Sequence, residues 1–228
     1  MNQLVTRGIV LSRTEYGEAD RIVTLLTPDH GKLRLMARGV RRVKSKLAGG
    51  IELFSVSDIT YIRGKGDLGT LVSARLDKYY SHIVRDIDRV QLGYELLKQL
   101  NKVTEDAPEA EYFALLEEIL AALDDDRIDT EVIKFWFSCQ ILRLGGHTPN
   151  LETDTAGAKL SADSTYTFSF DDMTMTPSGQ GTVMAAHIKL LRLGFGQHLL
   201  RNVAGVQGID KVLPEAGRLV QLMQQMYI

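Results

Sequence analysis

Apolar and polar residues alternate along the first third of the chain with the two-residue period of β-strands. Residues that favour turns, such as those at 28–31 and 64–67, interrupt the alternation. The pattern predicts five short strands, at residues 9–11, 21–27, 32–38, 51–62 and 70–76. Five strands in so short a segment favour a small closed β-barrel, of which the OB-fold is the commonest nucleic-acid-binding example.

After Lys78 the spacing of apolar residues lengthens to the period of an α-helix. The spacing predicts helices at residues 83–100, 112–123, 132–144, 182–193 and 209–226. The third of these is apolar nearly all round, which is typical of a helix buried at the centre of a bundle. Gly145 and Gly146, with Pro149 just beyond, are expected to end it.

Residues 150–180 are rich in Thr, Ser and Asp and predict a loop with a β-hairpin near Tyr166 to Phe170. The predicted fold class is therefore α+β. We expect an N-terminal five-stranded OB-fold barrel at residues 1–79 and an α-helical C-terminal domain at 80–228. The hairpin is expected to be inserted between two helices of the C-terminal domain.

The net charge of −2 over 228 residues conceals an uneven distribution. Residues 1–80 contain 14 basic and 8 acidic side chains, a net charge of +6, so the remainder carries −8. A basic segment joined to an acidic one indicates two modules with different partners.

Hydrophobic residues make up 44% of the chain, yet no run of eighteen apolar residues occurs, so no transmembrane helix is expected. The first residues lack the pattern of a secretion signal. The single cysteine, Cys139, cannot form an intramolecular disulfide and agrees with a reducing compartment. These features predict a cytoplasmic protein, associated with the nucleoid if it binds DNA.

The strongest functional signal is a run of seven cations, without one acid, in the fifteen residues from Lys32 to Lys46. On an extended strand Leu33, Leu35 and Ala37 face inward, and the alternate residues face outward. Cations in a row on one face are suited to nucleic-acid phosphates, because each one releases a condensed counterion. The predicted DNA-binding residues are Lys32, Arg34, Arg38, Arg41, Arg42, Lys44 and Lys46. A solvated basic face without a ligand is the alternative.

Three aromatic residues, Tyr16, Phe54 and Tyr61, could stack on bases. For Phe54 and Tyr61 the barrel core is the favoured location. Arginine and lysine in this run would position a strand without reading its sequence.

Other motifs do not indicate catalysis. Residues 64–69 match G-x-G-x-x-G, but a strand pattern follows them where a dinucleotide site needs a helix, so we interpret them as a hairpin turn. Asp124 to Asp126 fit a helix-ending turn better than a calcium loop, with Asp129 or Thr130 as the next N-cap. The five histidines are scattered, and Cys139 lies in the most apolar helix. No enzyme activity is expected.

Two stretches resemble the RecO family of recombination mediators. They are Gly8–Leu11 with Tyr16–Thr27, and the segment His30–Leu33, Ala37–Arg42, Lys44–Leu47 and Leu53–Phe54. The resemblance returns at Phe137, Leu144, Gly146, Pro149 and Leu151. It implies an OB-fold, a helical domain, binding to single- and double-stranded DNA, and annealing of complementary strands. It also implies partnership with RecR and with the acidic tail of single-stranded DNA-binding protein, to load a recombinase. In the matched motif, Glu18, Asp20 and Arg21 are expected to form a structural charge cluster.

Many members of that family carry a four-cysteine zinc site after the central helix, but residues 151–177 contain no cysteine. Asp154 and Gly157 stand near the position of the first cysteine pair. We therefore predict no cofactor and a hairpin held by packing alone.

For the acidic tail, a basic-rimmed groove between helices is expected. Lys134 and Arg143, which flank the buried helix, are its candidate cations, and the alternative is that both are ordinary surface charges. Two alternative functions remain open, a protein-interaction scaffold with no direct DNA role and an enzyme with an unfamiliar site.

Overall fold

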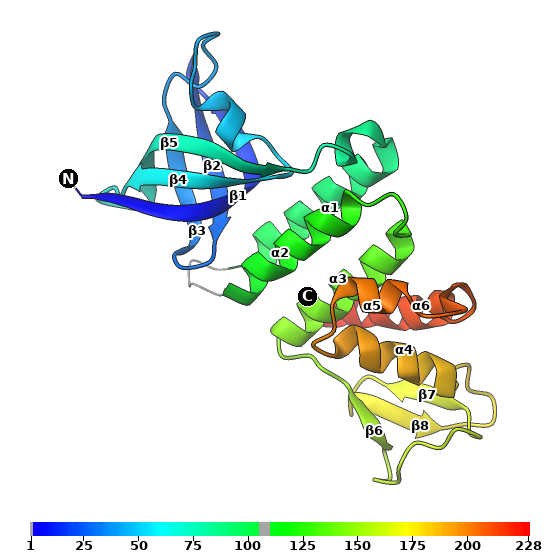
Figure 1. Cartoon of the computed structure of the whole chain (residues 1–228). Coiled ribbons are helices and arrows are strands. Elements are labelled where there is room, and N and C mark those ends of the chain that lie inside the picture. The colour runs from blue at the N-terminus through cyan, green and yellow to red at the C-terminus, as the bar shows by residue number, and fades with distance from the viewer. Residues whose placement is uncertain (1, 105–109) are drawn as a thin grey trace. The chain divides into compact units, whose positions relative to one another are not determined.

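The computed structural model describes residues 2–104 and 110–228. Internal contacts divide the chain into two compact units, Met1–Asp126 (unit 1) and Arg127–Ile228 (unit 2). Unit 1 contains a β-barrel and two α-helices, and unit 2 contains four helices and a small sheet (Figure 1). Each unit is described here by itself.

The barrel of unit 1 consists of β1 (Gln3–Tyr16), β2 (Asp20–Thr27), β3 (Gly31–Ala37), β4 (Ser55–Ile62) and β5 (Leu68–Tyr79). The strands are hydrogen-bonded in the order β1-β2-β3-β5-β4, and β4 pairs with β1 to close the barrel. The β3–β5 pair is parallel and the others are antiparallel. This topology confirms the predicted OB-fold and the α+β class.

The barrel interior is filled by the apolar residues of the alternating pattern, as expected for strands with one buried face. The buried cluster consists of Val10, Val23, Leu25, Leu35, Ala37, Val40, Ile51, Ile59, Tyr61 and Leu71. The strand predicted at 51–62 begins later, at Ser55, because Ala48–Ile51 form a 3₁₀ turn, η1. Gly50 permits the turn to pack on β5, since a Cβ there would lie 2.3 Å from the carbonyl oxygen of Ala74.

After the barrel come the short 3₁₀ turn η2 (Ile83–Arg85) and the helices α1 (Ile87–Val103) and α2 (Ala110–Leu123). Asp86 caps α1, because its carboxylate accepts the backbone N–H groups of Asp88 and Arg89. The two helices pack with the barrel strands, α1 against β1 and α2 against β2.

The aspartate run after α2 forms a helix-ending turn, as predicted. The buried guanidinium of Arg89 donates to the carbonyl oxygens of Leu123, Asp125 and Asp126, at 3.0–3.2 Å. Asp124 accepts the backbone N–H of His82 at 2.7 Å. The carbonyl groups that α2 leaves unpaired at its C-terminus are thus satisfied by a cation from α1.

Unit 2 is built around α3 (Thr130–Leu144), which packs against α4 (Ala185–Phe195), α5 (Leu200–Ala204) and α6 (Ile209–Tyr227). Its side chains are buried nearly all round, as predicted. Burial raises the pKa of the Cys139 thiol well above its ordinary value, which favours an inert packing role.

The ends of α3 follow the predicted signals. Asp129 is its N-cap and accepts the backbone N–H of Glu131 at 2.7 Å. At the other end, the N–H of His147 donates to Leu142 and that of Gly146 to Arg143, while Gly146 has a φ of +83°. This is a Schellman motif, which needs glycine at the left-handed position.

A three-stranded sheet follows α3, with β8 (Thr174–Pro177) between β6 (Asn150–Asp154) and β7 (Tyr166–Ser169). The β7–β8 pair is the predicted hairpin. Within the described ranges, none of the helices has the length and hydrophobicity that a membrane span requires.

We expect Arg89→Ala to lower the free energy of unfolding of unit 1 by about 3 kcal/mol, because three carbonyl groups would lose a charged donor. Chemical denaturation of the full chain, followed by circular dichroism, measures this change. Arg85→Ala is the matched control, since Arg85 is exposed and its loss should change the stability by less than about 0.5 kcal/mol. Equal effects of the two substitutions would contradict the assigned role.

Candidate nucleic-acid interface

Strand β3 lies between β2 and β5 and turns alternate side chains to opposite faces. Leu35 and Ala37 are in the barrel core, whereas Arg34 and Arg38 are exposed. The outward-facing Arg34 has Thr24 of β2 and Leu68 of β5 as its register partners. The alternation predicted for this strand is therefore confirmed.

Lys32 does not share the exposure of Arg34. Its ammonium group donates to the carbonyl oxygens of Asn101 and Thr104, at 3.1 and 2.7 Å, at the C-terminal end of α1. Its register partner on β2, Leu26, is only 2% exposed, although that residue faces outward. Lys32 thus points out of the barrel, as predicted, but helices cover this end of the outer face and its ammonium group caps the end of α1. Its assignment as a DNA-binding residue stays a prediction.

The loop after β3 is anchored to the turn between β1 and β2. Gly39, with a φ of +64°, donates its N–H to the carboxylate of Asp20 at 2.6 Å. The N–H of Arg41 donates to the carbonyl of Ala19 at 2.9 Å. Asp20 thus has the structural role that was expected, and it holds the start of the basic loop in place.

Arg41 belongs to an ion-pair cluster. Its guanidinium lies 2.8 Å from one carboxylate oxygen of Glu15, and that of Arg21 lies 2.9 Å from the other. Arg21 therefore has the expected structural role. Arg41 is exposed but is partly neutralised by the carboxylate it shares, so it is a weaker partner for phosphate than its neighbours.

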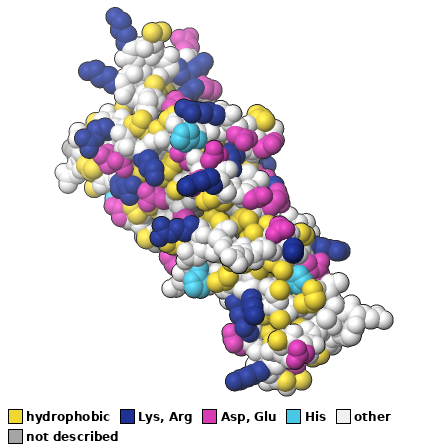
Figure 2. Space-filling view, turned by 45° about the vertical axis from the view of Figure 1, so that its right-hand side comes forward, with side chains coloured by type: hydrophobic (Ala, Val, Ile, Leu, Met, Phe, Trp, Pro, Cys, Tyr) yellow, Lys and Arg dark blue, Asp and Glu magenta, His cyan; other side chains and the backbone are white. Residues whose placement is uncertain are grey.

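The remaining members of the run have exposed side chains that make no hydrogen bond or ion pair with any other residue in the described ranges. They are Arg34, Arg38, Arg42, Lys44 and Lys46. Lys and Arg side chains are prominent at the upper end of the molecule in Figure 2, where the loop after β3 lies in Figure 1. Five exposed cations thus lie on one strand and the loop that follows it, and none has an acidic partner in the described residues.

Of the three aromatic residues considered for base stacking, only Tyr16 is accessible, with 55% of its surface exposed. Tyr61 is in the barrel core, and Phe54 packs edge to face on Tyr94 of α1 with a ring separation of 5.5 Å. Tyr16 pairs with Asp20 at the β1–β2 turn to which the basic loop is anchored. It is therefore the one of the three that a strand on this loop could reach.

In unit 2, the structure does not bring Lys134 and Arg143 to one groove, contrary to expectation. The two are nine residues apart on α3, about two and a half turns, so they project from opposite sides of the helix. Lys134 lines a groove of about 430 Å³ between α3 and α6, whose second cation is Arg218. Arg143 instead donates to the side chain of Gln140.

Asp154, in the segment after α3, holds a turn of the backbone. The carboxylate of Asp154 accepts the backbone N–H groups of Ala156 and Ala158, both at 2.9 Å. Throughout the described residues, no three His, Cys, Asp or Glu side chains are grouped as metal ligands.

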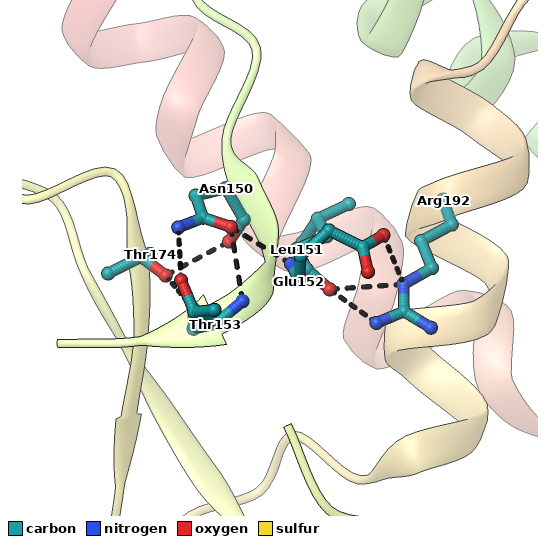
Figure 3. A network of polar contacts seen from close by, with 6 residues as sticks. All are labelled: Asn150, Leu151, Glu152, Thr153, Thr174 and Arg192. Carbon is teal, nitrogen blue, oxygen red and sulfur yellow. Dashed lines mark hydrogen bonds and ion pairs between the residues drawn. The ribbon is translucent and has the colours of Figure 1, made fainter. Parts of the chain in front are cut away.

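Hydrogen bonds connect the strands of this segment (Figure 3). The hydroxyl of Thr174 donates to the carbonyls of Asn150 and Thr153, and Arg192 of α4 donates to the carbonyl of Leu151 at 2.6 Å. Packing is therefore supplemented by polar contacts that the sequence did not reveal.

The barrel topology and its exposed basic loop place unit 1 in the class of OB-fold domains with a surface suited to nucleic acid. The chain also matches two family models, Recombination protein O N terminal at residues 1–80 and Recombination protein O C terminal at residues 86–228. It belongs to the RecO family.

Relatives in this family include a protein named DNA repair protein RecO from Desulfatibacillum aliphaticivorans, 31% identical over 155 residues, or 67% of this chain and 60% of the relative. Another, of the same name, from Dehalococcoides mccartyi is 31% identical over 163 residues, or 71% of this chain and 64% of the relative. The aligned part of this chain thus spans less than two thirds of the length of these relatives.

The geometry separates the roles of Lys32 and Arg34. We expect Lys32→Met to lower the free energy of unfolding by about 1 to 2 kcal/mol, because two carbonyl groups at the end of α1 lose their donor. Arg34→Met should leave stability within about 0.5 kcal/mol of the parent and reduce affinity for a single-stranded oligonucleotide. Chemical denaturation measures the stability of both variants, and fluorescence anisotropy measures their affinity for the oligonucleotide. A loss of stability in Arg34→Met, with a loss of affinity alone in Lys32→Met, would contradict both roles.

Proposed function

We propose that this protein is a DNA repair and recombination mediator that binds single- and double-stranded DNA and anneals complementary strands. With RecR, it helps to load a recombinase onto DNA covered by single-stranded DNA-binding protein. The observation that carries the proposal is the group of five exposed cations, Arg34, Arg38, Arg42, Lys44 and Lys46, without acidic partners in the described residues. The name of the relatives, DNA repair protein, supports it.

The basic loop is suited to phosphates and not to base edges. Its cations stand on an exposed strand and loop, where they can neutralise a backbone of any sequence. Two complementary strands repel each other through their phosphates, so a surface that neutralises one strand lowers the barrier to pairing with another. Sequence-independent contact of this kind is what annealing requires.

The proposed activity is not enzymatic, because it consists of binding and neutralisation and needs no nucleotide hydrolysis. We place the protein in the cytoplasm, at the nucleoid. The alternative is a scaffold whose OB barrel binds only proteins and whose basic loop is incidental, and the salt dependence of DNA binding distinguishes the two functions.

The triple variant Arg38→Ala, Arg42→Ala, Lys44→Ala tests the basic loop. If each cation contacts one phosphate of single-stranded DNA, the slope of log affinity against log salt falls by about 2. Fluorescence anisotropy at several salt concentrations measures the slope.

The matched control for this variant removes three exposed lysines of unit 2, Lys159, Lys189 and Lys211. It changes the net charge equally but leaves the basic loop intact, so it should leave the slope unaltered. A loss of affinity common to both triple variants would mean that overall charge, and not the loop, attracts DNA. Unchanged binding by the loop variant would favour the scaffold.

For the acidic tail of single-stranded DNA-binding protein, we propose the groove between α3 and α6. Its apolar lining includes Phe135, Leu213, Pro214 and Val220, which suit an apolar peptide end. Its cations are Lys134 and Arg218, and its acids are Asp129, Glu131 and Asp210.

Two of the groove's three acids are already engaged. Asp129 caps α3, and Glu131 lies 2.7 Å from the ammonium of Lys134. Arg218 is therefore the better anchor for a peptide carboxylate, while Lys134 is held by Glu131.

Removal of a positive charge from the groove should lower its affinity for an acidic peptide, and removal of a negative charge should raise it. Arg218→Glu should weaken binding of an acidic tail peptide about fivefold or more, and Glu131→Gln should strengthen it by releasing Lys134. Isothermal titration calorimetry measures both. Arg201→Glu is the control, since Arg201 is exposed in unit 2 and does not line the groove. Equal weakening by Arg201→Glu and Arg218→Glu would place the tail elsewhere.

A further inference from the structure

A pocket of about 190 Å³ lies beside the first residues of β3, at the turn that joins β4 to β5. The turn is the glycine-rich segment that resembles a dinucleotide motif but forms a hairpin. Its residues Gly64, Gly66 and Gly69 all line the pocket. The polar residues of the lining are His30, Lys32, Arg34, Tyr61, Arg63 and Asp67.

The pocket has an excess of positive charge. Arg34 and Arg63 are exposed, and neither makes an ion pair with a described acid. The ammonium of Lys32 is bound to carbonyl groups of α1, so it adds positive charge nearby without being available as a direct ligand. Against these cations the lining contains one carboxylate, Asp67.

A second carboxylate, Asp29, lies next to the pocket but is engaged. It accepts the hydroxyl of Thr6, and it lies 3.5 Å from the Nε2 atom of His30. Arg34 and Arg63 therefore remain the two guanidinium groups that can receive an anion at this place.

Tyr61 supplies an independent sign of a missing ligand. Tyr61 is 1% exposed, and its buried hydroxyl, which lies beside the guanidinium of Arg63, donates to no acceptor among the described residues. Burial raises the pKa of Tyr61, and the nearby guanidinium of Arg63 opposes this shift. The hydroxyl is thus a protonated donor beside a cation, and a buried donor without a partner destabilises the fold unless something else accepts from it.

The shape of the pocket limits the occupant. Leu35 and Tyr61, which line it, belong to the barrel core, so the core side chains form one side of the pocket. A volume of about 190 Å³ is large enough for one phosphate group. At Gly66 a Cβ would meet no atom within 4 Å, so the turn leaves the mouth open.

We propose that this pocket binds a phosphate group, held by Arg34 and Arg63 and by the hydroxyl of Tyr61. Guanidinium groups recognise phosphate through paired, charge-assisted hydrogen bonds. If the proposed function holds, the source is the terminal phosphate of a DNA strand. The pocket thereby distinguishes a strand end from the interior phosphates that the basic loop contacts.

The experiment compares three single-stranded oligonucleotides of one sequence, with a 5′-phosphate, a 3′-phosphate or hydroxyl groups at both ends. Fluorescence anisotropy measures their affinities for the full chain, and ³¹P line broadening measures binding of inorganic phosphate. We expect one of the phosphorylated strands to bind on the order of tenfold more tightly than the unphosphorylated strand.

Three variants locate the effect. Arg63→Gln and Tyr61→Phe should remove or reduce the preference for a phosphorylated end. Lys65→Gln should preserve it, because Lys65 carries the same charge on the same turn but does not line the pocket. Tyr61→Phe keeps the size of the side chain and removes an unpartnered hydroxyl, so an unchanged or raised melting temperature shows that the barrel is intact.

Each result has a definite meaning. Equal affinities for all three strands, without ³¹P broadening, overturn the proposal, as does a preference that survives Arg63→Gln. Broadening that depends on Arg63, without an end preference, supports the phosphate pocket and overturns the strand end as its source. If no oligonucleotide binds but phosphate still does, the pocket stands and the proposed DNA function fails.

Discussion

Unit 1 depends on cations that satisfy the C-terminal carbonyl groups of its helices. An α-helix leaves its last four carbonyls without partners within the helix, and burial of such groups without donors destabilises a fold. Lys32 of β3 serves the end of α1, and Arg89 of α1 serves the turn after α2. Strand β3 therefore stabilises the end of α1, and α1 stabilises the end of α2. This chain of contacts agrees with the extension of unit 1 to Asp126, beyond the barrel. The boundary expected at residue 79 follows the change of sequence period, and it also lies near the division between the two family models.

The same requirement divides the basic run into two groups. Lys32 is bound to carbonyls and Arg41 is paired with Glu15, so both contribute to the fold. The other five cations have no such partner in the described residues. Like charges held close together destabilise a protein slightly through mutual repulsion, and a bound polyanion would relieve that repulsion. The residues proposed to bind DNA are thus those whose side chains make no hydrogen bond or ion pair within the described residues.

The sequence predicted what depends on local pattern. Alternation located β3 and its inward residues, and the glycines after Leu144 predicted the end of α3, because these signals act over a few residues. The capping role of Lys32 could not be predicted, since its acceptors are about seventy positions away at Asn101 and Thr104. That Lys134 and Arg143 do not share one groove follows from their spacing, because a separation of nine residues on a helix puts the two on opposite sides. The second cation of the groove, Arg218, comes from α6, and only the packing of α3 against α6 shows that the two helices share a groove.

The segment after α3 is held together by hydrogen bonds of ordinary polar side chains. A structural zinc ion joins distant loops through four strong bonds, so each ligand is decisive. Here the loop at Asp154 is closed by two hydrogen bonds to one carboxylate, while Thr174 and Arg192 connect the sheet strands and α4 through backbone carbonyls. Each of these bonds contributes only about 1 kcal/mol, and together they distribute the stabilisation over several residues. No single substitution in such a network has the effect of losing a metal ligand. Cysteines at paired spacing are visible in a sequence, whereas Thr, Asn and Arg in a polar segment resemble an ordinary loop until the structure shows their partners.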